Sequence, residues 1–159
     1  DNFEQNLVVV QRYYNKQPKR CRTIKLLLQH EKAEGIHQPG GILKEPSAAL
    51  SILWMRRTLS FQNSFFDELS KTAPAQSDAP ARAALTAYHQ TLEPYHSNLL
   101  RKVYRIGLPR GMPDRQTLLA KFGGSERTID DMRKLVQVWR PLLKSMERPF
   151  LALDLEDYR

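Results

Sequence analysis

Cysteine is almost absent from this chain of 159 residues, since Cys21 is the only one. A single cysteine excludes an internal disulfide and leaves the redox compartment open. No apolar run approaches the ~20 residues that a membrane-spanning helix needs, and no signal peptide is recognisable. Strand patterns are also nearly absent, because the one β-branched run, residues 7–10, is flanked by helical patterns.

The residue types of catalytic and metal sites are present but not grouped. The four histidines share no ligand spacing, and no cysteine pair accompanies them, so we expect no metal site. Gly40-Gly41 and Gly123-Gly124 are better explained as helix ends than as phosphate-binding loops. No base is identifiable near Cys21, and no acid–base pair emerges elsewhere. The sequence therefore predicts neither an enzyme nor a cofactor.

The charge is strongly positive. A formal net charge of +8 and a pI of about 9.8 favour lipid headgroups, nucleic acid or an acidic protein surface as partners. The alternative is a basic surface that serves only solubility. Two basic clusters lie in residues 16–25 and 101–110, but neither has interleaved aromatics or a recognisable module. Solvated helix faces explain both clusters better than nucleic-acid binding does.

Proline and glycine divide the chain into helical stretches with short turns between them. We expect an all-α domain of packed helix hairpins, and 159 residues fit a single domain, residues 1–159. The expected helices are residues 2–15, 19–34, 46–71, 81–106 with a kink at Pro94, 114–122, and 126–146 with a bend near Pro141.

The central stretch, residues 46–71, is apolar on two sides. On a helical wheel, Trp54, Arg57, Phe61 and Phe65 share one face. A second, nearly opposite face carries Ile52, Met55, Leu59 and Phe66. A helix of this kind is sandwiched between layers. An indole one turn from a guanidinium indicates a place where a flat polar group meets an apolar interior.

One histidine lies among apolar residues. In the expected helix 81–106, His96 shares a face with Leu85, Leu92, Leu99, Leu100 and Val103. Such a histidine is either a satisfied core residue or a hydrogen-bond partner for a polar ligand group at the edge of an apolar cavity. The pattern leaves both interpretations open.

Four stretches together resemble the glycolipid transfer protein family. Residues 49–61, with Trp54 at their centre, resemble the family's central helix, and Ala87-Tyr88, Leu92 and Tyr95-His96 resemble a second family segment. Residues 106–119 and 6–24 match in the same order. The family's first helix has no counterpart, and the chain opens within a helix without Met, so we expect an upstream segment to be missing.

The resemblance implies a two-layer helical sandwich that holds one sphingolipid and moves it between membranes without chemistry. The headgroup residues implied in this way are Asn2, Asn6, Trp54 as a stacking platform, Arg57, and His96 at the ceramide amide. The hydrocarbon chains would lie in a pocket lined by Phe61, Phe65, Leu92, Leu99 and Val103.

The chain departs from the family pattern at three positions. Asn2 stands where an Asp is expected and Val9 where a Lys is expected, and Asn98 takes the neighbourhood of a membrane-dipping aromatic. Two charge-assisted contacts, each worth roughly 1.5–3 kcal/mol, would be lost from headgroup selection. Trp54 argues against the phosphosphingolipid branch, which has a basic residue there, although Arg57 is suited to meet an anionic headgroup.

Two hypotheses follow. The first is a sphingolipid or glycolipid carrier with peripheral membrane contact, cytoplasmic unless a leader has been removed, in which case it is organellar. The second is a structural or accessory subunit of a larger assembly that keeps the fold without transfer, which the losses at Asn2 and Val9 favour.

Overall fold

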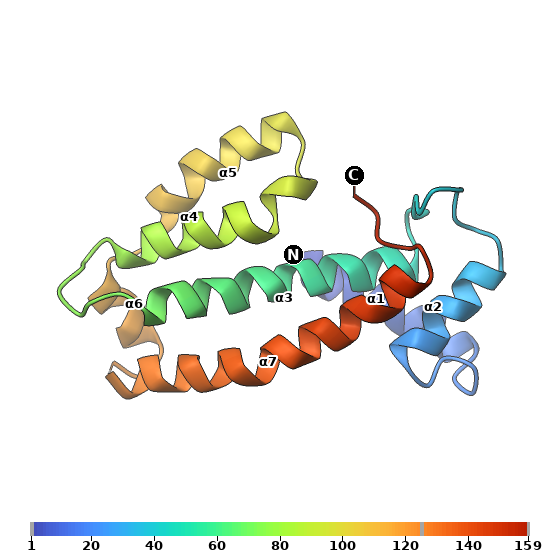
Figure 1. The fold of residues 1–159 in the computed structure, drawn as a ribbon, viewed down its shortest axis with the longest axis horizontal. Coiled ribbons are helices and arrows are strands. Elements are labelled where there is room, and N and C mark those ends of the chain that lie inside the picture. The colour runs from blue at the N-terminus through green and yellow to red at the C-terminus, as the bar shows by residue number, and fades with distance from the viewer. Residues whose placement is uncertain (1, 125, 159) are drawn as a thin grey trace. The chain divides into compact units, whose positions relative to one another are not determined.

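The structure is a computed structural model that describes residues 2–124 and 126–158, without the side chains of Asn2 and Glu126. Within these residues it is all-α, as expected, and the only β interaction is an isolated bridge between Gln38 and Ile42. The elements are α1 (Asn2–Lys16), α2 (Ile24–Ala33), α3 (Ala48–Ser70), α4 (Ala79–Thr91), the 3-10 helix η1 (Glu93–Tyr95), α5 (Asn98–Gly111), α6 (Arg115–Lys121) and α7 (Glu126–Ala152) (Figure 1). No helix of the described chain is long and apolar enough to cross a membrane.

The chain forms two compact units. Unit 1 comprises residues 1–59 and 142–159, and unit 2 comprises residues 60–141. The boundaries fall within α3 and within α7, so each of these helices contributes to both units. That residues 1–159 form a single domain stays a prediction.

Unit 1 is built on an aliphatic core. Leu28, Ala49 and Leu53 are fully buried, and Phe150 of α7 lies among them. Full burial of such a side chain stabilises the fold by roughly 1.5–3 kcal/mol. Val10 and Tyr13 of α1 pack against this core from one side. The core therefore holds the first part of α3, which carries Trp54 and Arg57.

Unit 2 has a core rich in alanine. Ala79, Ala83, Ala84 and Ala87 of α4 are buried with Phe65 and Leu69 of α3 and with residues of α6 and α7. Alanines at this spacing lie on one helix face, and their small side chains allow close helix packing. In the same unit, α4 and α5 lie side by side (Figure 1).

The expected helix 81–106 is wrong as a continuous element, because it is three elements. Pro94 lacks an N–H group and lies in η1, and His96 after it is extended, with φ −97° and ψ 143°. Ser97 then begins α5 as its N-cap by accepting a hydrogen bond from the Leu100 N–H group. His96 therefore does not share a helix face with Leu92 and Leu99.

Three helix boundaries also differ. The second helix begins at Ile24 and not at residue 19, because Thr23 caps it and residues 17–21 form a turn. Two helices extend beyond their expected ends at residues 106 and 146. α5 runs through Pro109 to Gly111, and α7 runs through Pro141 and Pro149 to Ala152.

Candidate functional site

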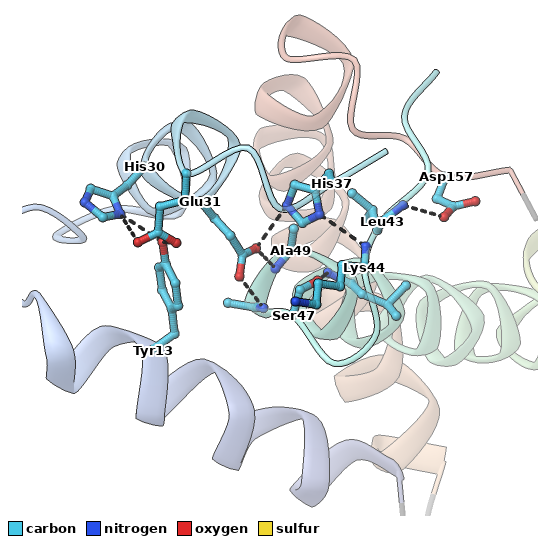
Figure 2. A network of polar contacts seen from close by, with 12 residues as sticks. Tyr13, His30, Glu31, His37, Leu43, Lys44, Ser47, Ala49 and Asp157 are labelled. Atoms are coloured by element: carbon cyan, nitrogen blue, oxygen red, sulfur yellow. Dashed lines mark hydrogen bonds and ion pairs between the residues drawn. The ribbon is translucent and has the colours of Figure 1, made fainter. Parts of the chain in front are cut away.

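The start of α3 is capped by a buried carboxylate from α2. Glu31, only 1% exposed, accepts hydrogen bonds from the N–H groups of Ala48 (2.8 Å) and Ala49 (2.6 Å), as Figure 2 shows. The first N–H groups of a helix have no partner within the helix, and the positive end of its dipole favours an anion there. Glu31 thereby fixes the start of α3 against α2, both in unit 1.

The loop before α3 is closed by a histidine. His37 Nδ1 accepts a hydrogen bond from the Lys44 N–H group (3.2 Å), and its Nε2 lies 3.4 Å from Glu31 Oε2 without hydrogen-bond alignment (Figure 2). Leu43 is tied at the other end of this loop, because its N–H group donates to the Asp157 carboxylate (3.0 Å). The loop is thus connected both to the α3 cap and to the segment after α7.

A second polar cluster joins α1 to α2. The Tyr13 hydroxyl donates to Glu34 Oε2 (2.9 Å) and lies 2.8 Å from His30 Nδ1 (Figure 2). Burial, and then the hydrogen bond to Glu34, raise the pKa of Tyr13 well above its ordinary value. Tyr13 therefore remains a protonated donor over the physiological pH range and holds the helix that carries Asn2 and Asn6.

Two consecutive arginines of α3 are buried in unit 1. The Arg57 guanidinium lies over the Trp54 indole, 5.0 Å from its ring centroid, and its Nη2 donates to the Asp157 carbonyl oxygen. Arg56 pairs with the Glu156 carboxylate and, at 3.4 Å, with Glu147, and its guanidinium lies over the Phe150 ring. The Glu156 carboxylate is also 3.7 Å from Arg57 Nη2. One carboxylate therefore serves two cations.

The structure brings two of the predicted headgroup residues together. Trp54 is half-buried, while Arg57 beside it is only 3% exposed. A cation over an indole face stabilises that ring orientation. Asn6 is half-buried on α1, and the predicted side chain of Asn2 lies outside those described.

His96 lies in an aromatic cluster of unit 2. Its Nδ1 is 3.1 Å from the hydroxyl of the fully buried Tyr88, and Tyr104 stacks on Tyr88 with ring centroids 5.2 Å apart and an interplanar angle of 7°. The His96 ring is also 4.9 Å from that of Tyr104. Burial, and then the charge of Glu93, raise the pKa of Tyr88. His96 therefore packs against both rings of the stacked Tyr88–Tyr104 pair.

Charged groups attach α5 to the end of α4. The buried Glu93 carboxylate accepts a hydrogen bond from Arg105 and pairs with His89, and Arg101 donates to the Glu93 main-chain oxygen (2.9 Å). Although burial opposes ionisation, the bonds from His89 and Arg105 lower the pKa of Glu93. The pairs of Glu93 with His89 and Arg105 therefore stabilise the fold at pH values above the ordinary pKa of a glutamate. This stabilisation is lost as the pH falls through the folded-state pKa of Glu93.

The predicted chain-pocket residues have different surroundings in unit 2. Phe65 is buried, with Phe61 packed against the same core, and Leu92 is half-buried. Leu99 and Val103 are 73% and 56% exposed, on a helix with no buried residue. A lining role for these five residues stays a prediction.

A surface groove of about 390 Å³ lies in unit 1. It is apolar and is lined from α1, α2, α3 and α7, and its lining includes Ile52 and Met55 of the second predicted apolar face. Cys21 also borders the groove, and burial raises the pKa of its thiol, which favours an inert, protonated state. In the part of the chain that the structure describes, no group of His, Cys, Asp or Glu is placed to hold a metal ion.

Several polar residues were missed from the sequence. Glu31 caps a helix that begins 17 residues later, and no local pattern marks such a cap. Glu156 and Asp157 pair with residues 100 positions earlier. A signal did exist for these two, because they form an acidic cluster with Asp154 in an otherwise basic chain.

The family model for glycolipid transfer protein matches residues 1–124, and this match includes the central helix with Trp54 and the segment with His96. The chain belongs to the glycolipid transfer protein family. Membership confirms the family resemblance and the fold class, and a family of transfer proteins confirms the expectation of a non-enzymatic function.

Solved structures of the glycolipid-transfer-protein fold are similar over nearly the whole chain. Human ceramide-1-phosphate transfer protein in complex with 12:0 ceramide-1-phosphate has a TM-score of 0.86 at 15% identity, covering 99% of this chain and 76% of that one. FAPP2, which selects simple glycosphingolipids, has a TM-score of 0.76 at 21% identity, covering 97% and 73%. The fungal glycolipid transfer protein HET-C2 has a TM-score of 0.77 at 17% identity, covering 98% of this chain and 73% of that one. No curated protein matches the chain in sequence.

Proposed function

We propose that this member of the glycolipid transfer protein family binds one sphingolipid or glycolipid and carries it between membranes without changing it chemically. The observation that carries this proposal is the Trp54–Arg57 pair, a half-buried indole fixed by a buried cation within the segment that the family model matches. The similar structures bind ceramide-1-phosphate or select simple glycosphingolipids, which supports a sphingolipid as the ligand class.

The proposed headgroup contacts are of two kinds, stacking and hydrogen bonding. The indole of Trp54 offers an apolar face to a sugar ring, while Asn6 and the amide of Asn2 offer neutral hydrogen bonds. His96 is proposed to meet the amide region of the ceramide, and its bond to Tyr88 fixes the ring that would do so. Because Val9 donates nothing, selection among neutral headgroups rests mainly on stacking.

A transfer assay tests the proposal directly. Donor vesicles carry a fluorescent glycosphingolipid, acceptor vesicles carry none, and the rate of dequenching is followed with and without the folded protein. The proposal requires protein-dependent transfer in proportion to protein concentration. A dequenching rate equal to that of vesicles alone would exclude transfer, provided that the circular dichroism spectrum of the protein shows the helical content of the fold.

We further propose that α5 makes the peripheral membrane contact. Its exposed side chains are both apolar and basic, which is the composition of a helix that lies in the headgroup region of a bilayer. The apolar set is Leu99, Leu100, Val103, Tyr104 and Ile106. The basic set is Lys102, Arg105 and Arg110, whose charge favours anionic lipid.

Replacing Leu99 by glutamate is expected to lower membrane binding about tenfold, because a side chain that would enter the interface is lost and a repelled anion takes its place. The measurement is flotation with vesicles that contain phosphatidylserine. Val138→Glu is the matched control, because Val138 is 65% exposed on α7. Equal losses for the two variants would show that α5 is not the docking helix.

The accessory-subunit hypothesis keeps its two supporting observations, Asn2 and Val9 at positions where the family pattern has an Asp and a Lys. Under this hypothesis the folded protein binds no sphingolipid and co-migrates with a large assembly in size-exclusion chromatography. The transfer assay and this co-migration together distinguish the two functions. The compartment stays a prediction in either case.

A further inference from the structure

The chain continues after α7 as a docked segment, residues 153–158, which we name the acidic segment. It leaves the helix at Asp154, whose φ of 54° turns the backbone, and the Leu155 N–H group donates back to the Phe150 carbonyl oxygen (2.9 Å). Leu155 is buried in the core of unit 1. A Cβ atom at Gly41 would lie 3.1 Å from the main-chain carbonyl oxygen of Asp154, so the loop before α3 packs directly on this segment.

The acidic segment carries three carboxylates, at Asp154, Glu156 and Asp157, in a chain whose net charge is +8. Glu156 and Asp157 are buried against the arginine pair of α3, while Asp154 is exposed. Arg56 donates a hydrogen bond to the Glu156 carboxylate. Arg57 donates to the Asp157 carbonyl oxygen and lies 3.7 Å from the Glu156 carboxylate. The segment therefore supplies a carboxylate that both arginines share, in addition to Glu147 of α7, which pairs with Arg56.

The pairing is incomplete. Within the described chain, Arg56 Nε and Glu156 Oε2 are buried and have no hydrogen-bond partner. The Glu156 carboxylate faces both guanidinium groups, and Glu147 of α7, 3.4 Å from Arg56 Nη1, is a second carboxylate beside Arg56. A phosphate or sulfate monoester has three terminal oxygens and matches guanidinium groups in bidentate geometry. Such a group has the chemistry to replace the Glu156 carboxylate as the shared partner of this arginine pair.

We infer that the acidic segment is an intramolecular anionic ligand of Arg56 and Arg57, and that the phosphate or sulfate headgroup of a sphingolipid displaces it. This inference rests on the proposed function and specifies the regulation of its headgroup site. With the segment bound, Arg57 is inaccessible and the half-buried indole of Trp54 receives neutral sugar headgroups. With the segment displaced, both arginines face the headgroup and the site selects an anion.

A charge-neutral variant of equal size tests the inference. Glu156→Gln removes the anion shared by both arginines, and Asp154→Asn removes an exposed anion of the same segment at a backbone angle that asparagine tolerates. Each protein is offered phosphatidylcholine vesicles with equal amounts of a phosphoceramide and a neutral glucosylceramide, and bound lipid is identified by native mass spectrometry.

Removing an internal competitor raises the anionic-to-neutral ratio of bound lipid about tenfold in Glu156→Gln. Asp154→Asn leaves the ratio at the wild-type value. An unchanged ratio in both variants overturns the inference.

A second measurement uses the unmutated chain, so that it does not depend on how the variant folds. Hydrogen exchange at the Leu155 amide, which is bonded to Phe150, is expected to accelerate with phosphoceramide and to stay slow with glucosylceramide. Protection that persists when phosphoceramide is bound overturns the inference. Acceleration by inorganic phosphate alone would also overturn it, since the ligand would then be free phosphate.

The failures are distinguishable. If neither lipid binds the wild-type protein, the proposed function falls together with this inference. If both lipids bind with an unchanged ratio and unchanged protection of Leu155, the carrier function stands and only the competition by the acidic segment is lost.

Discussion

Replacing Trp54 by alanine is expected to lower glycosphingolipid transfer at least about tenfold, since losing the burial of a large apolar side chain costs roughly 1.5–3 kcal/mol and 1.4 kcal/mol is a factor of ten. The indole is half-buried and held over the Arg57 guanidinium at 5.0 Å, so its orientation is set before a ligand arrives. Alanine removes both the stacking face and the cation–π contact. The vesicle-to-vesicle rate measures the effect.

Two controls separate stacking from folding. Trp54→Phe keeps a smaller aromatic face and is expected to retain part of the transfer rate. Trp139→Phe changes the other tryptophan, which packs on Phe66 in unit 2 at a centroid distance of 6.4 Å, and is expected to transfer at nearly the wild-type rate. Wild-type transfer by Trp54→Ala would remove the platform role from the indole.

Replacing Glu31 by alanine is expected to lower the free energy of unfolding by about 3–5 kcal/mol, because hydrogen bonds to a charged group contribute about 1.5–3 kcal/mol each and two are lost at a buried site. The N–H groups of Ala48 and Ala49 would be left without their acceptor at the start of α3. Urea unfolding followed by circular dichroism measures the change.

Glu45→Ala is the matched control for this prediction, because Glu45 is an exposed glutamate in the loop just before α3. A surface substitution of this kind changes stability by about 0.5 kcal/mol or less. If Glu31→Ala were as stable as Glu45→Ala, the buried carboxylate would not be what holds the start of α3. A carrier would then need another anchor for the helix that bears Trp54.

Local patterns in the sequence were sufficient for most of the helices and for one contact of the site. The apolar periodicity and the prolines placed α3 and α6 within two residues of their observed ends. The helical wheel put Trp54 and Arg57 on one face, and the structure has them in contact. Residues three positions apart on a helix are neighbours on its surface, and this proximity does not depend on the tertiary structure.

The surroundings of His96 show where local reasoning failed. Apolar spacing across residues 81–106 indicated one kinked helix, whereas Pro94 ends the helical hydrogen bonding and Ser97 starts a new helix. The N-cap signal of Ser97 was present in the sequence and outweighs the apolar period. As a result, Leu99 and Val103 lie on a separate, exposed helix.

The partners of the buried charged residues could not be predicted, for a different reason. Arg56 and Glu156 are 100 residues apart, and a salt bridge leaves no trace in the spacing of either segment. The same holds for Glu31 and the start of α3. Such contacts depend on which elements the fold places side by side, so they had to come from the structure.

The two functional hypotheses differ most simply in what the folded protein holds. Native mass spectrometry of the purified chain, after incubation with vesicles that contain sphingolipid, measures this directly. The carrier account predicts one mass shifted by a single sphingolipid per chain, and loss of that shift in Trp54→Ala. A folded wild-type protein that stays lipid-free under these conditions would contradict the account and leave the accessory-subunit hypothesis in its place.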